Sequence, residues 1–344
     1  MALQTSGQIS LNDIHVEAGG SSGTQASIND ADIRGLISKG SGVQMSFSEW
    51  YGASNVFAFT ISANTANGNL STLATAAGWN GTSAIEVTIN SSVYLYATDT
   101  SNYGLLVNVA NSTVKNYGYI MGMGGRGADS TKSGSGKAYQ SGYPAISITQ
   151  SGCSIINYSG AYIGGGGGGG ALGTYAGGGG GAGGGLGGNG SRNHALNGRT
   201  PGAGGTPGNK GAAPVEGKDS GDRHPGQCGG AGGNGTAWYD TGGDSGGSGG
   251  RIFPGLSVPG GYAYQGHGGG SGGGGGKPGG TTSGPWDPSS GNYSPNWGPR
   301  GGSYAGGGGG GWGAAGEGGG AAGAAISKTT TYTLSNSGTI YGAT

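Results

Sequence analysis

Uninterrupted runs of glycine are the feature that most limits how this chain can fold. Glycine makes up 94 of the 344 residues. Four runs contain nothing else: Gly164–Gly170, Gly177–Gly181, Gly272–Gly276 and Gly306–Gly311. Glycine loses more backbone freedom on folding than any other residue, and it has no side chain to bury. Order in these runs must therefore come from hydrogen bonds between closely packed backbones, and only a hydrogen side group permits that closeness.

The rest of the composition argues against a disordered chain and against a nucleic-acid-binding one. Charged residues are 9% of the chain, and it has 18 Tyr, 6 Trp and 4 Phe, whereas disordered segments are usually charged and poor in aromatic residues. The formal net charge is zero, so the basic surface of a nucleic-acid-binding protein is not expected. No apolar run approaches the roughly 20 residues of a membrane span. The first residues lack the basic and apolar segments of a signal peptide.

The signals for helices gather in residues 1–54. Ser10 is a good N-cap for a helix that begins at Leu11. Residues 29–37 place acids in a first helical turn and put apolar residues on one face. Residues 46–52 predict a last short turn closed by glycine. We expect a small helical module here.

Residues 55–163 alternate in the manner of strands and contain a repeat that returns near the end of the chain. The pattern apolar-x-Asn-x-Gly-x-Ile-x-Gly occurs around Asn116 and Asn336, and around Asn157 with one residue inserted. Each copy follows another apolar strand, which predicts stacked strand–turn–strand rungs, as in a short β-solenoid. Asparagine and glycine suit the turns because both tolerate a left-handed backbone.

The third copy of the repeat follows the glycine-rich residues, which are therefore an insertion between two rungs. The two ends of the insertion, Gly164 and Gly323, are expected to lie close together. The sequence thus predicts a mostly β protein in three parts. These are a helical module (1–54), a solenoid-like shaft (55–163, completed by 326–344) and an inserted glycine-rich domain (164–325).

The insertion alternates glycine runs with aromatic segments. Extended, polyproline-II-like glycine runs can pack side by side and hydrogen-bond to one another as a polyglycine-II bundle. Loops on such a rigid scaffold have the layout of a binding surface, and the alternative is that their rings cap the bundle. The candidate binding residues are Trp238, Tyr239, Phe253, Tyr262, Tyr264, Trp286, Tyr293 and Trp297.

Three segments resemble phage proteins. In composition and layout, residues 164–325 are similar to the receptor-binding adhesins at the tips of T-even-type phage long tail fibres, which use a polyglycine-II sandwich to present variable loops. Residues 116–127, Asn-Tyr-Gly-Tyr-Ile-Met-Gly-Met-Gly-Gly-Arg-Gly, look like the rungs that precede glycine-rich domains in tailed-phage fibre proteins. Residues 6–54 resemble a module that begins many phage virion proteins. The tip adhesins attach to a separate fibre, whereas here an attachment module is built in.

This resemblance implies an adhesin in the virion, at the phage tail, fibre or tip. It would contact other tail proteins through residues 1–54 and a host glycan or outer-membrane protein through the aromatic loops. A homotrimer is one alternative for its oligomeric state. The second hypothesis is a non-adhesive structural virion protein, as a fibre, baseplate or decoration component. An ice-binding protein ranks third, because it would need flat, regular faces lined by Thr or Ala.

The motifs of enzymes and metal sites are weak. Residues 122–127 match a dinucleotide fingerprint, but no apolar-faced helix follows them. His224 and Cys228 lack a second pair of metal ligands nearby, and the carboxylates are scattered. We expect no enzyme activity, no cofactor and no metal. Cys153 and Cys228 could form one bridge, but two buried thiols are favoured because two cysteines make no disulfide framework.

Overall fold

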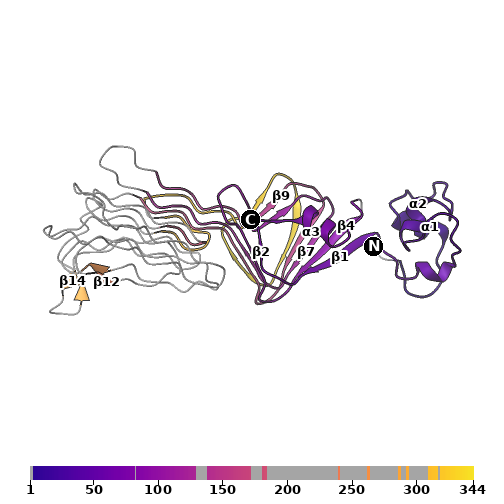
Figure 1. Ribbon diagram of the computed structural model, residues 1–344, viewed down its shortest axis with the longest axis horizontal. Helices are drawn as coiled ribbons and strands as arrows, with labels where there is room; N and C mark the ends of the chain where they lie inside the picture. Colours follow the sequence, from indigo (N-terminus) through magenta and orange to yellow (C-terminus); the bar gives the residue numbers. More distant parts are fainter. Residues whose placement is uncertain are drawn as a thin grey trace.

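The computed structural model describes residues 3–81, 83–128, 138–171, 180–183, 309–316 and 318–344. It also gives the backbone of four two-residue strands within the glycine-rich insertion. In Figure 1, the helical module, the sheets and the described glycine segments follow one another along the longest axis.

The N-terminal module contains the three expected helical segments: α1 (Leu11–Glu17), α2 (Ala31–Gly35) and the 3-10 helix η1 (Phe47–Trp50). Ser10 caps α1 in a capping box with Asp13. Ile14, Ile33 and Trp50 are fully buried, and the Trp50 indole N–H donates to the Ile33 carbonyl at 3.0 Å. One small core therefore joins all three segments.

A buried arginine and a backbone hydrogen bond close the module. Arg34 Nε donates to the Gly40 carbonyl at 2.8 Å, and Nη2 donates to the Val43 carbonyl at 2.7 Å, which ties the loop after α2 to the helix. The Leu3 N–H donates to the Ala53 carbonyl at 2.8 Å. The two ends of the module are therefore adjacent.

The following strands form three parallel sheets. The first sheet contains β1 (Val56–Ile61), β4 (Ala84–Ile89), β7 (Thr113–Asn116), β10 (Cys153–Asn157) and β17 (Tyr332–Asn336). The second contains β2 (Thr65–Ala66), β5 (Tyr94–Tyr96), β8 (Tyr119–Met121), β11 (Tyr162–Gly164) and β18 (Thr339–Tyr341). The third contains β3 (Gly68–Asn69), β6 (Leu105–Val107), β9 (Ile146–Ile148) and β16 (Ile326–Lys328). Each of the first four turns of the chain adds one strand to each sheet in the same order, and a last turn adds β17 and β18 to the first two sheets. We call this unit the three-sheet stack.

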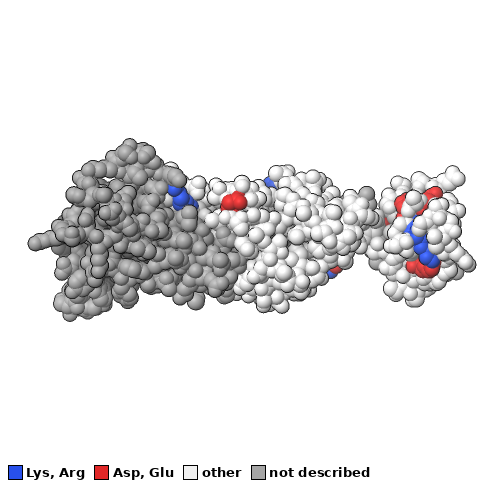
Figure 2. Space-filling model, viewed as in Figure 1, with Lys and Arg blue, Asp and Glu red and all other residues white. Residues whose placement is uncertain are grey.

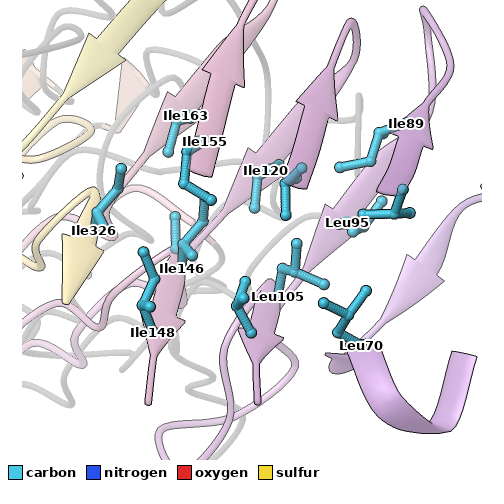
Figure 3. Packing of buried hydrophobic residues seen from close by; sticks show 14 of the residues in the cluster. Leu70, Ile89, Leu95, Leu105, Ile120, Ile146, Ile148, Ile155, Ile163 and Ile326 are labelled. Atoms are coloured by element: carbon cyan, nitrogen blue, oxygen red, sulfur yellow. The ribbon is translucent and has the colours of Figure 1, made fainter. Parts of the chain in front are cut away.

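Apolar residues in equivalent positions of successive turns build the core of the three-sheet stack. In the second sheet, Leu95, Ile120 and Ile163 are paired in register and fully buried. Figure 3 shows them among the buried residues contributed by the other two sheets. Successive residues of a strand point to opposite faces, so alternate positions supply this interior.

The asparagines of the repeat do more than shape turns. Asn116 Nδ2 donates to Asn157 Oδ1 at 2.8 Å, and Asn157 Nδ2 donates to Asn336 Oδ1 at 2.8 Å. Asn116 and Asn157 are buried, and Asn116 Oδ1 also accepts from the Gly118 N–H at 3.0 Å. The three residues form a hydrogen-bonded ladder across successive strands of the first sheet.

A short helix covers the first end of the three-sheet stack. Helix α3 (Leu70–Ala76) begins after Asn69, whose side chain accepts from the Thr72 N–H at 3.2 Å. Leu70 and Ala74 are fully buried in the core. This helix is not predictable from the sequence pattern, because its seven residues are too few to show the apolar periodicity of a helix.

The glycine-rich insertion leaves from one corner of the three-sheet stack, between the second and third sheets. At this corner, each connection runs from a strand of the second sheet to a strand of the third sheet. The first connection is Asn67 alone, with a φ of 51°. The later connections become longer: residues 97–104, then 122–145, then 165–325. The Gly323 N–H donates to the Gly166 carbonyl at 2.8 Å, which confirms that the two ends of the insertion lie close together.

Candidate functional site

The glycine run 164–170 continues from β11 and lies among other backbone segments. Its hydrogen-bond partners change with a period of three residues. The carbonyls of Gly164, Gly167 and Gly170 accept from Gly122, Gly125 and Ala128 at 2.9, 2.8 and 3.1 Å. Those of Gly165 and Gly168 accept from Gly313 and Gly310 at 2.7 and 2.8 Å, and those of Gly166 and Gly169 accept from Gly323 and Gly320 at 2.8 and 2.7 Å. One run is therefore bonded to three different segments by its carbonyls alone.

The spacing of these segments leaves no room for side chains. A Cβ atom at Gly166 would overlap the Met123 carbonyl oxygen, and one at Gly168 would overlap that of Gly320. These obstacles are backbone atoms, which cannot rotate away as the end of a flexible side chain can. Residues 122–128, which include the dinucleotide fingerprint, are hydrogen-bonded parts of this packing.

A buried tryptophan joins the glycine segments to the three-sheet stack. Trp312 is fully buried and packs with Met121 and Ala182. Tyrosines of the second sheet surround this cluster: Tyr94, Tyr96, Tyr119, Tyr162 and Tyr341. The rings of Tyr94 and Tyr119 stack with their centroids 4.5 Å apart. The pKa of Tyr94 is raised, mainly by burial and to a smaller extent by the neighbouring Tyr119. Trp312 therefore anchors the returning segment of the glycine-rich insertion to the second sheet.

Four of the eight candidate binding residues lie in the short strands of the insertion. Tyr239 in β12 (Tyr239–Asp240) pairs in parallel with Tyr262 in β13 (Tyr262–Ala263). Trp286 in β14 (Trp286–Asp287) pairs in antiparallel with Tyr293 in β15 (Asn292–Tyr293). These four candidate residues therefore form two pairs of neighbours on adjacent strands. Trp238, Phe253, Tyr264 and Trp297 lie outside the described residues.

Sequence reasoning missed several aromatic residues that the structure describes. Tyr117 and Tyr158 stack at 4.1 Å on the three-sheet stack, and Tyr139 beside the glycine segments is 44% exposed. Trp312 was missed as well. A single large ring directly after a run of glycines is a sequence signal for a packing contact, here with Met121 and Ala182. Only the register of the strands shows which of these rings meet.

The described surface offers little charge or metal-binding chemistry. Figure 2 shows few acidic or basic side chains on the described part of the three-sheet stack in that view, and Lys115 and Glu86 form an ion pair at 2.7 Å. Within the described ranges, no three His, Cys, Asp or Glu residues gather as metal ligands, and no helix has the length and apolar character to span a bilayer. Cys153 is a free, buried thiol, and Cys228 lies outside the described residues.

Comparison with known protein families identifies one match. A family model described as phage tail fibre adhesin Gp38 matches residues 56–246, more than half of the chain. The chain belongs to the Gp38 family of phage tail fibre adhesins. Its members are proteins of the virion tail, and the family points to a structural, non-enzymatic protein.

One solved structure is also similar to this Gp38-family chain. It is the crystal structure of the gp37-gp38 adhesin tip complex of the bacteriophage S16 long tail fiber, with 18% identity, 99% coverage of each chain and a TM-score of 0.38. No curated protein matches the chain. The family match begins at β1, so the helical module lies outside the matched residues.

Proposed function

We propose that this tail fibre adhesin binds a host-surface glycan or outer-membrane protein through the aromatic loops of its glycine-rich insertion. The observation that carries this proposal is the pairing of Tyr239 with Tyr262 and of Trp286 with Tyr293 within the insertion. Tyr and Trp present flat apolar rings with a polar group, which suit sugar rings and protein anchors alike. The backbone pairing places two of these candidate residues opposite each other in each pair of strands.

We further propose that residues 164–325 form a polyglycine-II domain mounted on a short β-solenoid made of residues 55–163 and 326–344. A polyproline-II helix has three residues per turn, so a run in that conformation meets each neighbour at every third residue. The threefold sequence of carbonyl partners along residues 164–170 supports this conformation. The regular addition of one strand per sheet supports the solenoid.

Attachment to the virion is assigned to residues 1–54. The module has its own core around Trp50, and its two ends are adjacent. Asn55 follows it, and the Asn55 N–H donates to Glu17 Oε1 at 3.0 Å. A module with a separate core can dock to another tail protein while the insertion stays free to contact a host.

The competing hypothesis is a non-adhesive structural protein of the fibre, baseplate or a decoration. Such a protein needs the glycine scaffold but not aromatic loops. Cell binding by the isolated protein distinguishes the two, because a spacer has no affinity for the host surface.

Deleting residues 1–54 tests both assignments in one experiment. The purified full-length and shortened proteins should bind host cells equally, whereas only the full-length protein should be incorporated into virions. Fluorescence of labelled protein on cells and immunoblots of purified particles give the two readouts. Incorporation of the shortened protein would refute the attachment role, and failure of the full-length protein to bind the phage's host would favour the spacer.

A further inference from the structure

Two Asn-Gly pairs lie in the described part of the three-sheet stack, and their surroundings differ. One pair is Asn67-Gly68, at the first connection between the second and third sheets, and the other is Asn80-Gly81, in the loop between α3 and β4. An asparagine side chain reacts with the next backbone nitrogen most readily when glycine follows, because glycine has no Cβ to crowd that nitrogen. The local structure decides which of the two pairs can react.

Hydrogen bonds hold the reacting groups of Asn67-Gly68. Asn67 Nδ2 donates to Thr98 Oγ1 at 2.7 Å, and Asn67 Oδ1 accepts from the Thr98 N–H at 2.9 Å. The N–H of the buried Gly68 donates to the Gly104 carbonyl at 3.1 Å. Because both the side chain that would be attacked and the attacking nitrogen are engaged, this pair must open before it can react.

The attacking nitrogen of Asn80-Gly81 is accessible. Asn80 and Gly81 are both exposed, and the Gly81 N–H donates no hydrogen bond to the described residues. A Cβ atom built on Gly81 would face open space. Water and base can therefore reach this N–H without any opening of the structure.

Two donors address the side-chain oxygen of Asn80. Asn80 Oδ1 accepts from the Ser83 N–H and from Ser83 Oγ, both at 3.0 Å. Ser83 is buried, and its hydroxyl oxygen accepts from the Trp79 indole N–H at 3.1 Å, which leaves the hydroxyl hydrogen to donate to Asn80. Attack on Asn80 Cγ places negative charge on Oδ1, and donors already aimed at that oxygen stabilise the transition state.

We propose that Asn80 is a site of spontaneous deamidation, whereas Asn67 is protected. The Gly81 nitrogen loses its proton to water and bonds to Asn80 Cγ; the Cγ–Nδ2 bond breaks, and Nδ2 takes up a proton and leaves as ammonia. A water molecule then opens the resulting succinimide ring at one of its two carbonyl carbons, which gives aspartate or isoaspartate. Both products carry a new carboxylate, and in isoaspartate the backbone runs through the former side chain.

The modification falls where a tryptophan fixes the loop to the core. Trp79 packs against the core of the three-sheet stack, and its indole N–H also donates to the Ser83 carbonyl at 2.8 Å. Isoaspartate at position 80 lengthens the backbone between Trp79 and Ser83 by one carbon, which displaces these partners from each other. A virion protein is not replaced after assembly, so the modified loop accumulates with the age of the particle.

Peptide mass spectrometry of the full-length protein, aged at mildly alkaline pH, tests this proposal. Chymotrypsin cuts after Leu70 and Leu73 and so separates the two pairs. In the folded protein, Asn80 should deamidate about a hundredfold or more faster than Asn67, which must first break three hydrogen bonds. In denaturant the two rates should converge, because both pairs are then unprotected Asn-Gly sequences.

One substitution at each pair tests the role of its hydrogen bonds. Ser83→Ala removes one donor to Asn80 Oδ1 and should slow deamidation of Asn80 about fivefold, with Asn67 unchanged. Thr98→Ala removes an acceptor of the Asn67 amide and should speed up deamidation of Asn67. Equal rates at the two asparagines in the folded wild type contradict the proposal, whether or not the variants fold. An unchanged or higher rate at Asn80 in a Ser83→Ala protein that circular dichroism shows to be folded contradicts the role of the donors.

Discussion

At the residue scale, the asparagines of the repeat can be recognised in the sequence, but the contacts that they make cannot. The spacing around Asn116, Asn157 and Asn336 is visible in the sequence and predicted the rungs. The repeat predicts a role in turns for these residues, yet their side-chain amides also hydrogen-bond to one another, and Asn116 and Asn157 are buried. That contact depends on the register of β7, β10 and β17, which a single sequence does not contain.

The middle member of the ladder should matter most for stability. Asn157→Ala removes the shorter of the two hydrogen bonds donated by the buried Asn116 amide and leaves only the one to the Tyr162 carbonyl at 3.3 Å. Under-satisfying a buried polar group in this way costs about 1–3 kcal/mol. We expect the free energy of unfolding, measured by chemical denaturation, to fall by about 2 kcal/mol. Asn336→Ala, at the exposed end of the ladder, should lose less; an equal loss in both variants would mean that the ladder is not the cause.

At the element scale, the predictable features were those set by local pattern. The helical segments of the module, the longer strands of the three-sheet stack and the insertion between two turns followed from capping residues, alternation and the repeat, whereas the two-residue strands β2 and β3 did not. Helix α3 and the anchoring by Trp312 were missed. The first has too little periodicity of its own, and the second depends on where the returning segment meets the second sheet.

The glycine run offers a sharp test of its packing. Gly168→Ala should destabilise the protein, because its methyl group would overlap the Gly320 carbonyl oxygen. Gly35→Ala, within α2 and facing open space, should be neutral or stabilising by up to about 1 kcal/mol, since alanine is the better helix former. Thermal unfolding of both variants measures the contrast, and a Gly168→Ala protein as stable as the wild type would show that the run is loosely packed.

At the scale of the whole molecule, the chain is an adhesin whose parts are separated along its length. A module with its own core precedes β1, three sheets form the rigid centre, and the insertion leaves from a single corner of them. We propose that these parts have separate functions. The proposal assigns attachment to residues 1–54 and recognition to residues 164–325, and the family match to residues 56–246 is compatible with that separation.

The central claim is that aromatic loops recognise the host, and the most direct test measures binding and unfolding of the same variants. Trp286→Ala and Trp297→Ala should each weaken binding to host cells by about 2 kcal/mol or more, roughly thirtyfold in dissociation constant, because buried aromatic anchors dominate interfaces. Their unfolding temperature should be nearly unchanged, and Tyr139→Ala, an exposed tyrosine outside the candidate set, should bind normally. Full binding by both folded tryptophan variants, or lost stability that accounts for lost binding, would contradict the claim.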